Sequence, residues 1–554
     1  CVGLCFCVPP GGPLAAAEMS ICELPKAGLN LLVSGCDAFE NCNVSQSWSA
    51  QLPSLPPSTQ QQLRFAPAGA PASNASFITF GALLSLAPIG SAYYGYSRGM
   101  KGSLELFERL VQERGGLLVN GTRRPFRFAI VSDESRLDLT TNATAHAIRG
   151  LGADFMLGGF SSGFTNYAAR QSYADKTIML ATTAATPSVI SQNNLTFGVL
   201  PPSPRYIKTA VEAIVDAADA CDSRLDRCWR GMPPRCRGAT CRESLKAGFI
   251  AARTKFTSVM CSLGAGVTQE AGVPVALNSS GLPLITTVAP AFSVGISQEY
   301  IDDIKEALQP LRDEGVTLLV GCTYLGTGKG LMLALQQLGW APLAVVTTAT
   351  LSEGRIHAEL RSTAPLALSW AAEYTVEPMV WHPSLSGRGT WSNLTSIEFT
   401  RQFQRANGGE LVSYIGAAAF AASCSLADAI ERAGSLETDE VAAALNSATL
   451  FEFFSNLTYN KDGQADEDMM VLQFQPGRVD ETVVAGVANG RTVENLPIDL
   501  RHASGGGEPS LGPMLFPQPT WEQRACERRL HPGVLKAGEN IEEIQCSGHG
   551  HCDM

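Results

Sequence analysis

Short apolar segments alternate with amphipathic stretches along most of the chain. Apolar segments typical of buried strands cover residues 77–86, 126–133, 153–160 and 177–182. The stretches that separate them, such as 100–116 and 165–176, repeat their apolar residues at helical spacing. Strands that alternate with helices form mostly parallel sheets covered by helices on both faces, so we expect an α/β fold.

The same alternation begins again after the proline-rich junction Leu200–Tyr206 and continues to about residue 349. Two α/β series of similar length predict two lobes, and a cleft between lobes is where small ligands usually bind. A third section, 373–477, adds two helical stretches and two strand-like segments around the turn Lys461–Gly463. Residues 1–75 are rich in Cys, Pro, Ser and Gln, which predicts a disulfide-pinned or disordered leader.

Composition narrows the class of protein. The 554 residues are 45% hydrophobic and 17% charged, with a net charge of −11, which is typical of a folded, weakly charged protein. No basic stripe is present, so we expect no nucleic-acid partner. No run of about 18 apolar residues occurs, because even the Ala-rich stretch Ile415–Ala429 contains polar residues. We therefore expect any membrane anchor to lie outside this chain.

The sixteen cysteines occur mainly in groups, with six before residue 43, four between Cys221 and Cys241, and three near the C-terminal end. Such groups in loop-like sequence predict disulfides. A zinc site is the alternative for the second group, although its spacing lacks the C-x-x-C pairs of zinc motifs. We expect the three single cysteines, Cys261, Cys322 and Cys424, to be buried free thiols.

Acceptor motifs for N-glycosylation, Asn-x-Ser/Thr, are more frequent than chance suggests. Their asparagines are Asn43, Asn74, Asn120, Asn142, Asn194, Asn278, Asn393 and Asn456. Glycans are bulky and hydrated, so a glycosylated surface would also keep a chain of low charge in solution. We expect an extracellular or cell-surface glycoprotein of the secretory pathway, with chance enrichment as the alternative. Residues 1–17 end in small residues like a signal segment but lack a basic region.

Several segments together resemble the type I periplasmic-binding-protein family, which includes Leu/Ile/Val-binding proteins and the ligand-binding regions of eukaryotic receptors. The segments are FITFGALLSL (77–86), YGYSRGMKGSLELFERLVQERGGLLVNG (94–121), LGGFSSGFTNYAARQSYADKTIMLATTAATPSV (157–189), FFSNLTYNKDGQADEDMMVLQFQPG (453–477) and FPQPTWEQR (516–524). The resemblance covers roughly residues 77–525. Residues 546–554 (CSGHGHCDM) resemble the start of an EGF-like module, with Cys546 and Cys552 as its first cysteines.

The resemblance implies two lobes, each a mostly parallel sheet flanked by helices, joined by three hinge crossings. These crossings would fall near Leu200–Pro204, Glu373–Val380 and Phe454–Tyr459. The expected domains are a leader (1–75), the first part of lobe 1 (76–203), lobe 2 (204–375), the second part of lobe 1 (376–455), return strands to lobe 2 with an exit segment (456–525), and a linker with the EGF-like start (526–554).

Small hydroxyl side chains follow two of the predicted strands. Ser161 and Ser162 follow the strand that ends at Phe160, and Thr182–Thr186 follow the next strand. Ligands of open parallel sheets bind outside the carboxyl ends of the strands, and a helix N-terminus at such an end attracts anions. The alternative is that Ser161 and Thr186 only cap the helices that follow them.

The resemblance implies a role for these residues, because amino-acid binders of the family hold the ligand from matching positions. Ser161 or Ser162, together with Ala184 and Thr186, match the positions that hold the carboxylate and the amino group. Tyr94 matches an aromatic residue at the border of the pocket. A packing cluster with Tyr93 and Tyr96 is the alternative.

The second lobe offers Thr323 and Tyr324, which follow the strand 316–322 where the family places a lobe-closing aromatic residue. One departure concerns the acid that accepts the ligand ammonium in amino-acid binders. At that position the chain has Thr347, Thr348 and Ala349 instead. A buried ammonium without a carboxylate partner is costly, which argues against an α-amino-acid ligand.

No set of residues indicates an enzyme. The segment GTGKG (326–330) lacks the spacing of a phosphate loop, and Asp133–Glu134 resemble a helix-capping turn rather than an acid/base pair. We therefore expect no catalysis, no cofactor and no metal site.

The interpretation that follows is an extracellular domain of a receptor-like protein that closes two lobes around a small polar, amino-acid-like ligand. A homodimer through lobe 1 is left open. The alternatives are the solute-binding component of an ABC transporter, or an adhesion glycoprotein that has lost its ligand.

Overall fold

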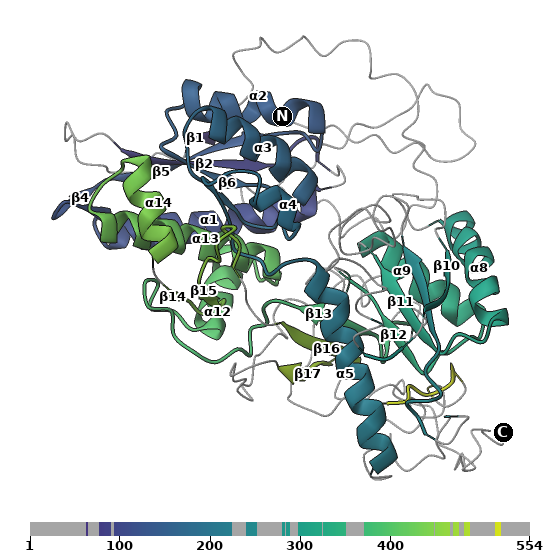
Figure 1. The fold of residues 1–554 in the computed structure, drawn as a ribbon. Helices are drawn as coiled ribbons and strands as arrows, with labels where there is room; N and C mark the ends of the chain where they lie inside the picture. Colours follow the sequence, from purple (N-terminus) through teal and green to yellow (C-terminus); the bar gives the residue numbers. More distant parts are fainter. Residues whose placement is uncertain are drawn as a thin grey trace, which may run out of the picture. The chain divides into compact units, whose positions relative to one another are not determined.

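The structure is a computed structural model, and two sheets organise the residues that it describes (Figure 1). The described residues are 63–64, 77–89, 93–223, 236, 240–251, 277, 280–282, 284–288, 297–323, 325–348, 350, 371–447, 449–465, 469–475, 481–487, 516–521 and 524. Most of the predicted leader and the whole EGF-like segment lie outside them.

The first sheet has the strand order β1-β5-β2-β6-β7-β8 among the described residues. Its strands are β1 (Leu63–Arg64), β2 (Ile78–Leu84), β5 (Phe126–Ser132), β6 (Phe155–Gly158), β7 (Met179–Ala181) and β8 (Thr196–Gly198). All pairs are parallel except β1 with β5. A separate hairpin joins β3 (Leu117–Val119) to β4 (Thr122–Arg124).

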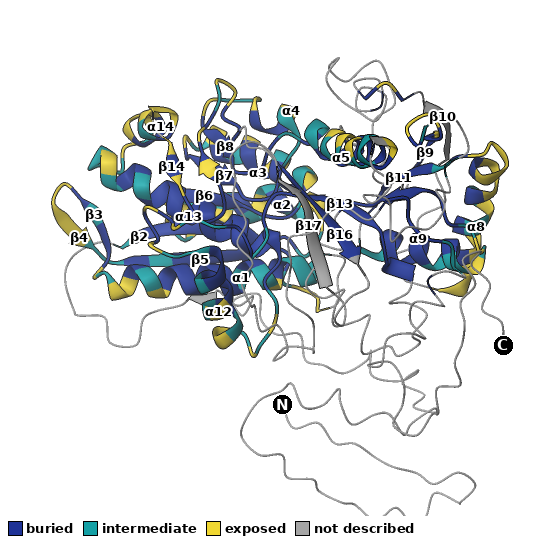
Figure 2. Ribbon diagram, turned by 90° about the horizontal axis from the view of Figure 1, so that it is seen from below, coloured by how far each residue is buried: buried dark blue, intermediate teal, exposed yellow. Residues whose placement is uncertain are grey.

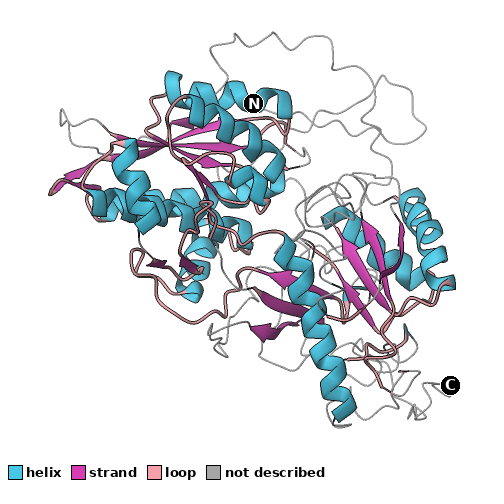
Figure 3. Cartoon of the chain, viewed as in Figure 1, coloured by secondary structure: helices cyan, strands magenta, loops and turns pink. Residues whose placement is uncertain are grey.

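Helices follow the strands of the first sheet and cover both of its faces (Figure 3). They are α1 (Tyr94–Glu113), α2 (Leu137–Ala145) with a π-helical extension (His146–Gly150), α3 (Ser162–Ala174) and α4 (Pro187–Ile190). The side chains of β2 point alternately to the two faces of the first sheet. Phe80 packs in one core with α1, whereas Leu83 packs in another with residues of α3.

The second sheet has the order β10-β9-β11-β12-β13-β16-β17. Its strands are β9 (Ala247–Ala251), β10 (Leu284–Val288), β11 (Leu318–Cys322), β12 (Ala344–Val346), β13 (Val376–Met379), β16 (Met470–Gln475) and β17 (Glu481–Val487). The first five are mutually parallel, and β16 and β17 are antiparallel to their neighbours. Leu318 packs in a core with α5 (Pro204–Ser223), whereas Leu319 packs with α8 (Gln298–Asp313) and α9 (Leu325–Gln337).

Three later helices, α12 (Ser396–Ala406), α13 (Tyr414–Ala433) and α14 (Thr438–Ser447), join the core of the first sheet. The Ala-rich α13 packs along α1, and its residues are buried from Tyr414 to Ala427 (Figure 2). Small side chains allow this close approach. No helix among the described residues is both long and apolar enough to span a membrane. The first sheet with α1–α4 and α12–α14 is called the first lobe below, and the second sheet with α5, α8 and α9 the second lobe.

The chain passes between the two sheets three times, and the structure describes the residues of the first two passages. The first passage joins β8 to α5, and the second joins β13 to α12. The third lies later than expected, because Phe454–Tyr459 belong to the first lobe instead of crossing out of it. There β14 (Leu450–Phe451) pairs with β15 (Asn456–Leu457), and Tyr459 packs on Phe197 at 5.2 Å between ring centroids. The third passage lies between Ala465, which belongs to the first-lobe core, and β16 in the second sheet.

These observations confirm the predicted α/β fold with mostly parallel sheets and flanking helices. Sequence periodicity located the sheets because buried parallel strands are continuous apolar segments.

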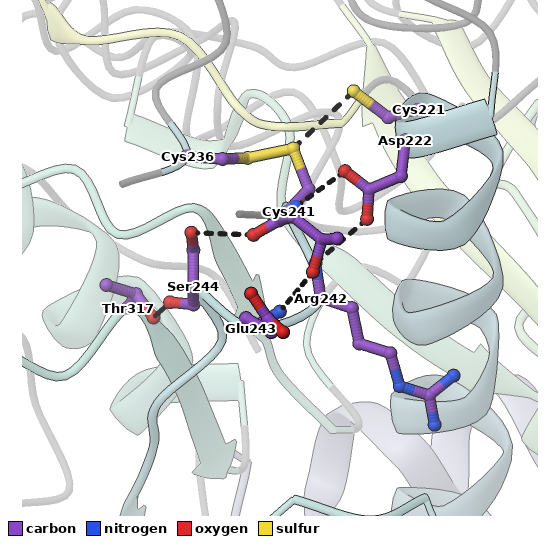
Figure 4. Close-up of a disulfide and its surroundings, with 9 residues drawn as sticks. Cys221, Asp222, Cys236, Cys241, Arg242, Glu243, Ser244 and Thr317 are labelled. Atoms are coloured by element: carbon purple, nitrogen blue, oxygen red, sulfur yellow. Dashed lines mark hydrogen bonds between the residues drawn. A yellow bond between two sulfur atoms is a disulfide. The ribbon is translucent and has the colours of Figure 1, made fainter. Parts of the chain in front are cut away.

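Cys221, Cys236 and Cys241 are disulfide-bonded, as the grouping of cysteines in loop-like sequence predicted. Cys236 is bonded to Cys241, Cys221 is also disulfide-bonded, and the Cys221 and Cys241 sulfurs lie 3.7 Å apart (Figure 4). Since neither of these sulfurs carries a hydrogen, the short distance is a packing contact. The Asp222 carboxylate accepts from the Cys241 amide at 2.6 Å and fixes this junction to the end of α5.

The single cysteines differ from one another. Cys424 is a buried free thiol, which confirms the prediction for that residue. The prediction for Cys322 was wrong, because Cys322 is disulfide-bonded. Spacing along the sequence gives no information on whether an isolated cysteine finds a partner in the fold. Cys261 lies outside the described residues.

Candidate functional site

The two hydroxyl-rich loops predicted from the sequence lie side by side at the carboxyl edge of the first sheet. β6 and β7 are parallel neighbours, with Gly158 opposite Ala181. The Thr182 hydroxyl donates to the Gly158 carbonyl oxygen at 2.6 Å, and the Thr183 hydroxyl donates to that of Gly159 at 3.0 Å. These bonds join the loop that follows β7 to the loop that follows β6.

Gly159 is required where the first of these loops approaches β2. A Cβ atom on Gly159 would lie 2.5 Å from the Leu83 carbonyl oxygen, so any other residue would push the loop away from the sheet. The Thr165 hydroxyl, one turn into α3, also donates to the Gly159 carbonyl oxygen at 3.0 Å. Three contacts therefore fix the position of Gly159, two residues before Ser161.

Ser161 and Thr186 occupy the N-cap positions of α3 and α4, but neither side chain accepts a capping hydrogen bond. Their carbonyl oxygens instead accept from the amides of Thr165 and Val189 in the next turn, both at 3.0 Å. Ser161, Ser162 and Thr186 are half-buried and Ala184 is buried. The alternative that these side chains only cap the helices is therefore wrong for the usual side-chain cap, because neither hydroxyl bonds to the helix that follows it.

The first turn of α3 adds main-chain donors to this edge. The first N–H groups of an α-helix have no partner within the helix, and they carry the positive end of its dipole. Ser162 and Gly163 lie in that turn, next to the Ser161 hydroxyl. The combination of hydroxyls and helix N–H groups favours a carboxylate or another small anion.

The tyrosines near the start of α1 divide into two kinds. Tyr93 packs on Phe160 and Phe164, with ring centroids 5.6 and 5.3 Å away, and Tyr96 stacks on Phe160 at 4.3 Å. The packing alternative therefore holds for Tyr93 and Tyr96. Tyr94 is the first residue of α1, is half-buried, and makes no ring contact with the described residues.

Asp133 is a fully buried acid at the same edge of the sheet, directly after β5. Its Oδ1 accepts from the Ser85 hydroxyl at 2.5 Å and from the Ser135 amide at 2.8 Å. Burial raises the pKa of the Asp133 carboxyl, and Oδ2 has no partner among the described residues. Asp133 thus closes a turn, as expected, but α2 begins later, with Arg136 as its N-cap.

In the second lobe, the hydroxyl and the amide of Thr323 both form hydrogen bonds within the protein. Its hydroxyl donates to the Thr348 carbonyl oxygen at 2.9 Å, and its amide donates to the Thr348 hydroxyl at 2.9 Å. Thr323 is 1% exposed, so its hydroxyl links two loops rather than facing a ligand. Tyr324, the other residue predicted here, lies outside the described residues.

A carboxylate that sequence reasoning missed lies beneath Thr347 and Thr350. Glu377 on β13 is fully buried, and its carboxylate accepts from the Thr347 hydroxyl at 3.0 Å and from the Thr350 amide at 3.0 and 3.1 Å. The register pairs Val346 with Val376, which places Glu377 beside the end of β12. The signal in the sequence that could have identified this acid is a glutamate inside an otherwise apolar strand. The second lobe therefore has an acid near the position where its absence was inferred.

Comparison with known proteins places this geometry in a family. The model of the periplasmic binding protein family matches residues 83–478. No curated protein matches the chain by sequence. Many solved structures share its fold at low identity.

Three of these structures illustrate the likeness. A leucine-binding protein from Thermotoga maritima has a TM-score of 0.52 and 14% identity, over 72% of this chain and 95% of its own. A solute-binding protein of an ABC transporter from R. palustris, solved with benzoate, has a TM-score of 0.55 and 15% identity, over 76% and 98%. An ABC transporter substrate-binding protein from Desulfitobacterium hafniense, solved with leucine, has a TM-score of 0.53 and 14% identity, over 74% and 100%.

Identities this low establish the fold alone, whereas the family model spans most of the chain. The α/β fold, with parallel strands in both sheets and helices that flank them, agrees with that match. The chain belongs to the periplasmic binding protein family.

Proposed function

We propose that this chain binds a small solute that carries a carboxylate, and that the loops after β6 and β7 hold this group. One observation carries the proposal: the hydroxyls of Ser161 and Thr186 are uncommitted to their helices, on two loops that hydrogen bonds hold side by side. Leucine and benzoate, the ligands of two similar structures, differ in most respects but share a carboxylate.

The remaining predicted contacts complete the proposal. Ala184 offers main-chain groups in the second loop, Ser162 offers an N–H group and a hydroxyl at the start of α3, and Tyr94 borders the site. The resemblance to the family assigns the cover of the ligand to Tyr324 in the second lobe. The ligand stabilises the closed state because that state has the higher affinity for it. Binding, not catalysis, is the general activity of this family.

The role supported best is that of the solute-binding component of an ABC transporter, because the similar structures include such components. The family also implies a location outside the cytoplasm, in the periplasm or the extracellular space.

The ligand-binding region of an extracellular receptor is the second candidate. It is favoured by the acceptor asparagines for glycosylation, since every one within the described residues is exposed. These are Asn120, Asn142, Asn194, Asn393 and Asn456. Mass spectrometry of the native protein before and after enzymatic deglycosylation separates the two roles. A mass loss supports the receptor, and an unchanged mass supports the transporter component.

Calorimetric titration with leucine and with benzoate tests the binding site. Ser161→Ala and Thr186→Val each remove one hydrogen bond to a charged group, so we expect affinities lower by about 10- to 100-fold. Ser191→Ala, an exposed hydroxyl on the same lobe, is the matched control and should change affinity less than about twofold. Equal affinities for the wild type and both site variants would contradict the proposed site.

A further inference from the structure

The side chain of Gln464 joins the proposed binding loop to a passage between the sheets. Gln464 is 2% exposed, and its amide nitrogen donates to the carbonyl oxygens of Ala185 at 3.3 Å and Leu200 at 3.2 Å. Ala185 lies between the two proposed ligand contacts of the second loop. Leu200 lies in the first passage, and Gln464 and Ala465 are the last described residues before the third.

Main-chain hydrogen bonds connect the same three segments. The Gly198 amide donates to the Gly463 carbonyl oxygen at 2.9 Å, and the Ala465 amide donates to that of Gly198 at 2.8 Å. The Ser203 amide, at the far end of the first passage, donates to the Ala185 carbonyl oxygen at 2.7 Å. The Ala185 carbonyl oxygen therefore accepts from both the first passage and Gln464.

The turn before Gln464 fixes where its side chain begins. The Asn460 carboxamide oxygen accepts from the amides of Asp462 at 2.9 Å and Gln464 at 3.1 Å. Gly463 has φ +79°, and a Cβ atom there would lie 2.7 Å from the Thr196 carbonyl oxygen. Only glycine fits this position. The turn Asn-Lys-Asp-Gly-Gln therefore fixes the backbone from which the Gln464 side chain extends.

A primary amide suits this role because it has two N–H donors and the two acceptors are main-chain carbonyl oxygens from different segments. An ionised glutamate has no donor and a protonated one has a single O–H, and methionine has neither a donor nor a comparable acceptor. A residue that only filled space would need no such amide.

We infer that Gln464 is a positioning residue that couples the binding loop 184–186 to the first and third passages. A ligand that contacts Ala184 or Thr186 then alters the freedom of both passages through one side chain. This inference rests on the proposed function, and it adds the means by which an occupied site changes the segments that connect the lobes.

Amide hydrogen exchange of the ligand-free protein tests the connection. Gln464→Met keeps the volume and removes both donors, so exchange of the Ser203 amide should accelerate about 5- to 30-fold, as expected for the loss of one or two hydrogen bonds. The Val199 amide donates to the Ala181 carbonyl oxygen at 3.2 Å without Gln464, and should be unchanged. Gln464→Asn, whose amide is one methylene too short to reach both acceptors, should have the same effect if the first variant folds poorly.

Gln473→Met is the matched control. Gln473 is 1% exposed, and its amide also donates to a main-chain carbonyl oxygen, that of Tyr374 at 3.3 Å, but inside the second sheet. This variant should leave Ser203 exchange unchanged. An unchanged Ser203 rate in the Gln464 variants, or an equal acceleration of Val199, would overturn the connection.

A double-mutant cycle tests the coupling itself. Thr183→Val removes the bond to Gly159 and loosens the binding loop, which should accelerate Ser203 exchange in the wild-type background but add little in the Gln464→Met background. Additive effects would refute the coupling. Since this cycle needs no ligand, its failure is distinct from failure of the proposed function, which the leucine and benzoate titrations decide.

Discussion

Glu108 on α1 provides a test of how this fold accommodates a buried charge. Its side chain is 5% exposed, and Oε1 has no hydrogen-bond partner among the described residues. Burial raises the pKa of the Glu108 carboxyl from 4.5 to about 7, although the Phe128 amide donates to it, and the negative charge of Glu105 raises it further. Glu108→Gln replaces the carboxyl by a neutral group of the same shape.

The sign of the pH effect follows from this raised pKa. The folded protein binds the proton more tightly than the unfolded chain, so the free energy of unfolding falls as the pH rises from 4.5 to about 7 and stays lower above it. A pKa change of one corresponds to about 1.36 kcal/mol, so the rise of the Glu108 pKa from 4.5 to about 7 limits the effect to roughly 3 kcal/mol. Glu108→Gln should therefore stabilise the protein by about 2–3 kcal/mol more at pH 8 than at pH 5.

Urea unfolding at pH 5 and at pH 8 measures this difference in stability. Hydrogen exchange of the amides in α1 and β5 is a second measurement at the elements that contain Glu108 and Phe128. Glu113→Gln makes the same chemical change at an exposed position of the same helix and should shift stability by less than about 0.5 kcal/mol at either pH. If the stability difference between Glu108→Gln and wild type is the same at both pH values, the carboxyl is not held neutral by burial and the reasoning fails.

Three further predictions follow from buried groups. Burial raises the pKa of the Cys424 thiol well above its usual range, so a thiol reagent at pH 8 should label Cys424 only as the protein unfolds; rapid labelling of the native protein would contradict this. Gly463→Ala combines a positive φ with a clash at Thr196 and should cost about 2–4 kcal/mol in thermal unfolding, whereas Gly121→Ala, with a similar φ but open space, should cost about 1 kcal/mol. Glu377→Gln places an amide group against the Thr350 N–H and should destabilise the second sheet by about 1–3 kcal/mol, measured by hydrogen exchange; an unchanged rate would show that the loop does not depend on this carboxylate.

The sheets were predictable because their strands are fully buried and therefore continuous in apolar residues. The Ala-rich stretch around Ile415 was also correctly judged too polar for a membrane span, since α13 lies in the first-lobe core. The third passage was placed too early because Phe454 and Leu457 have the same apolar pattern whether they cross between sheets or fold back onto one. The periodicity of apolar residues predicts that a residue is buried, but it does not predict which core the residue joins.

The site was predictable only in part. Ser161 and Thr186 could be located because both follow strand ends, and strand ends are visible in the sequence. The roles of Asp133, Glu377 and Gln464 could not, because each depends on partners from distant segments. Only the folded chain brings Glu377 beneath Thr350, or the Gln464 amide to Leu200.

A crystal structure of the protein with leucine or benzoate bound tests the central claim most directly. The account predicts that the ligand carboxylate lies within about 2.7–3.1 Å of the Ser161 and Thr186 hydroxyl oxygens, next to the first turn of α3. A ligand bound away from the loops after β6 and β7, or one whose carboxylate faces solvent, would contradict it.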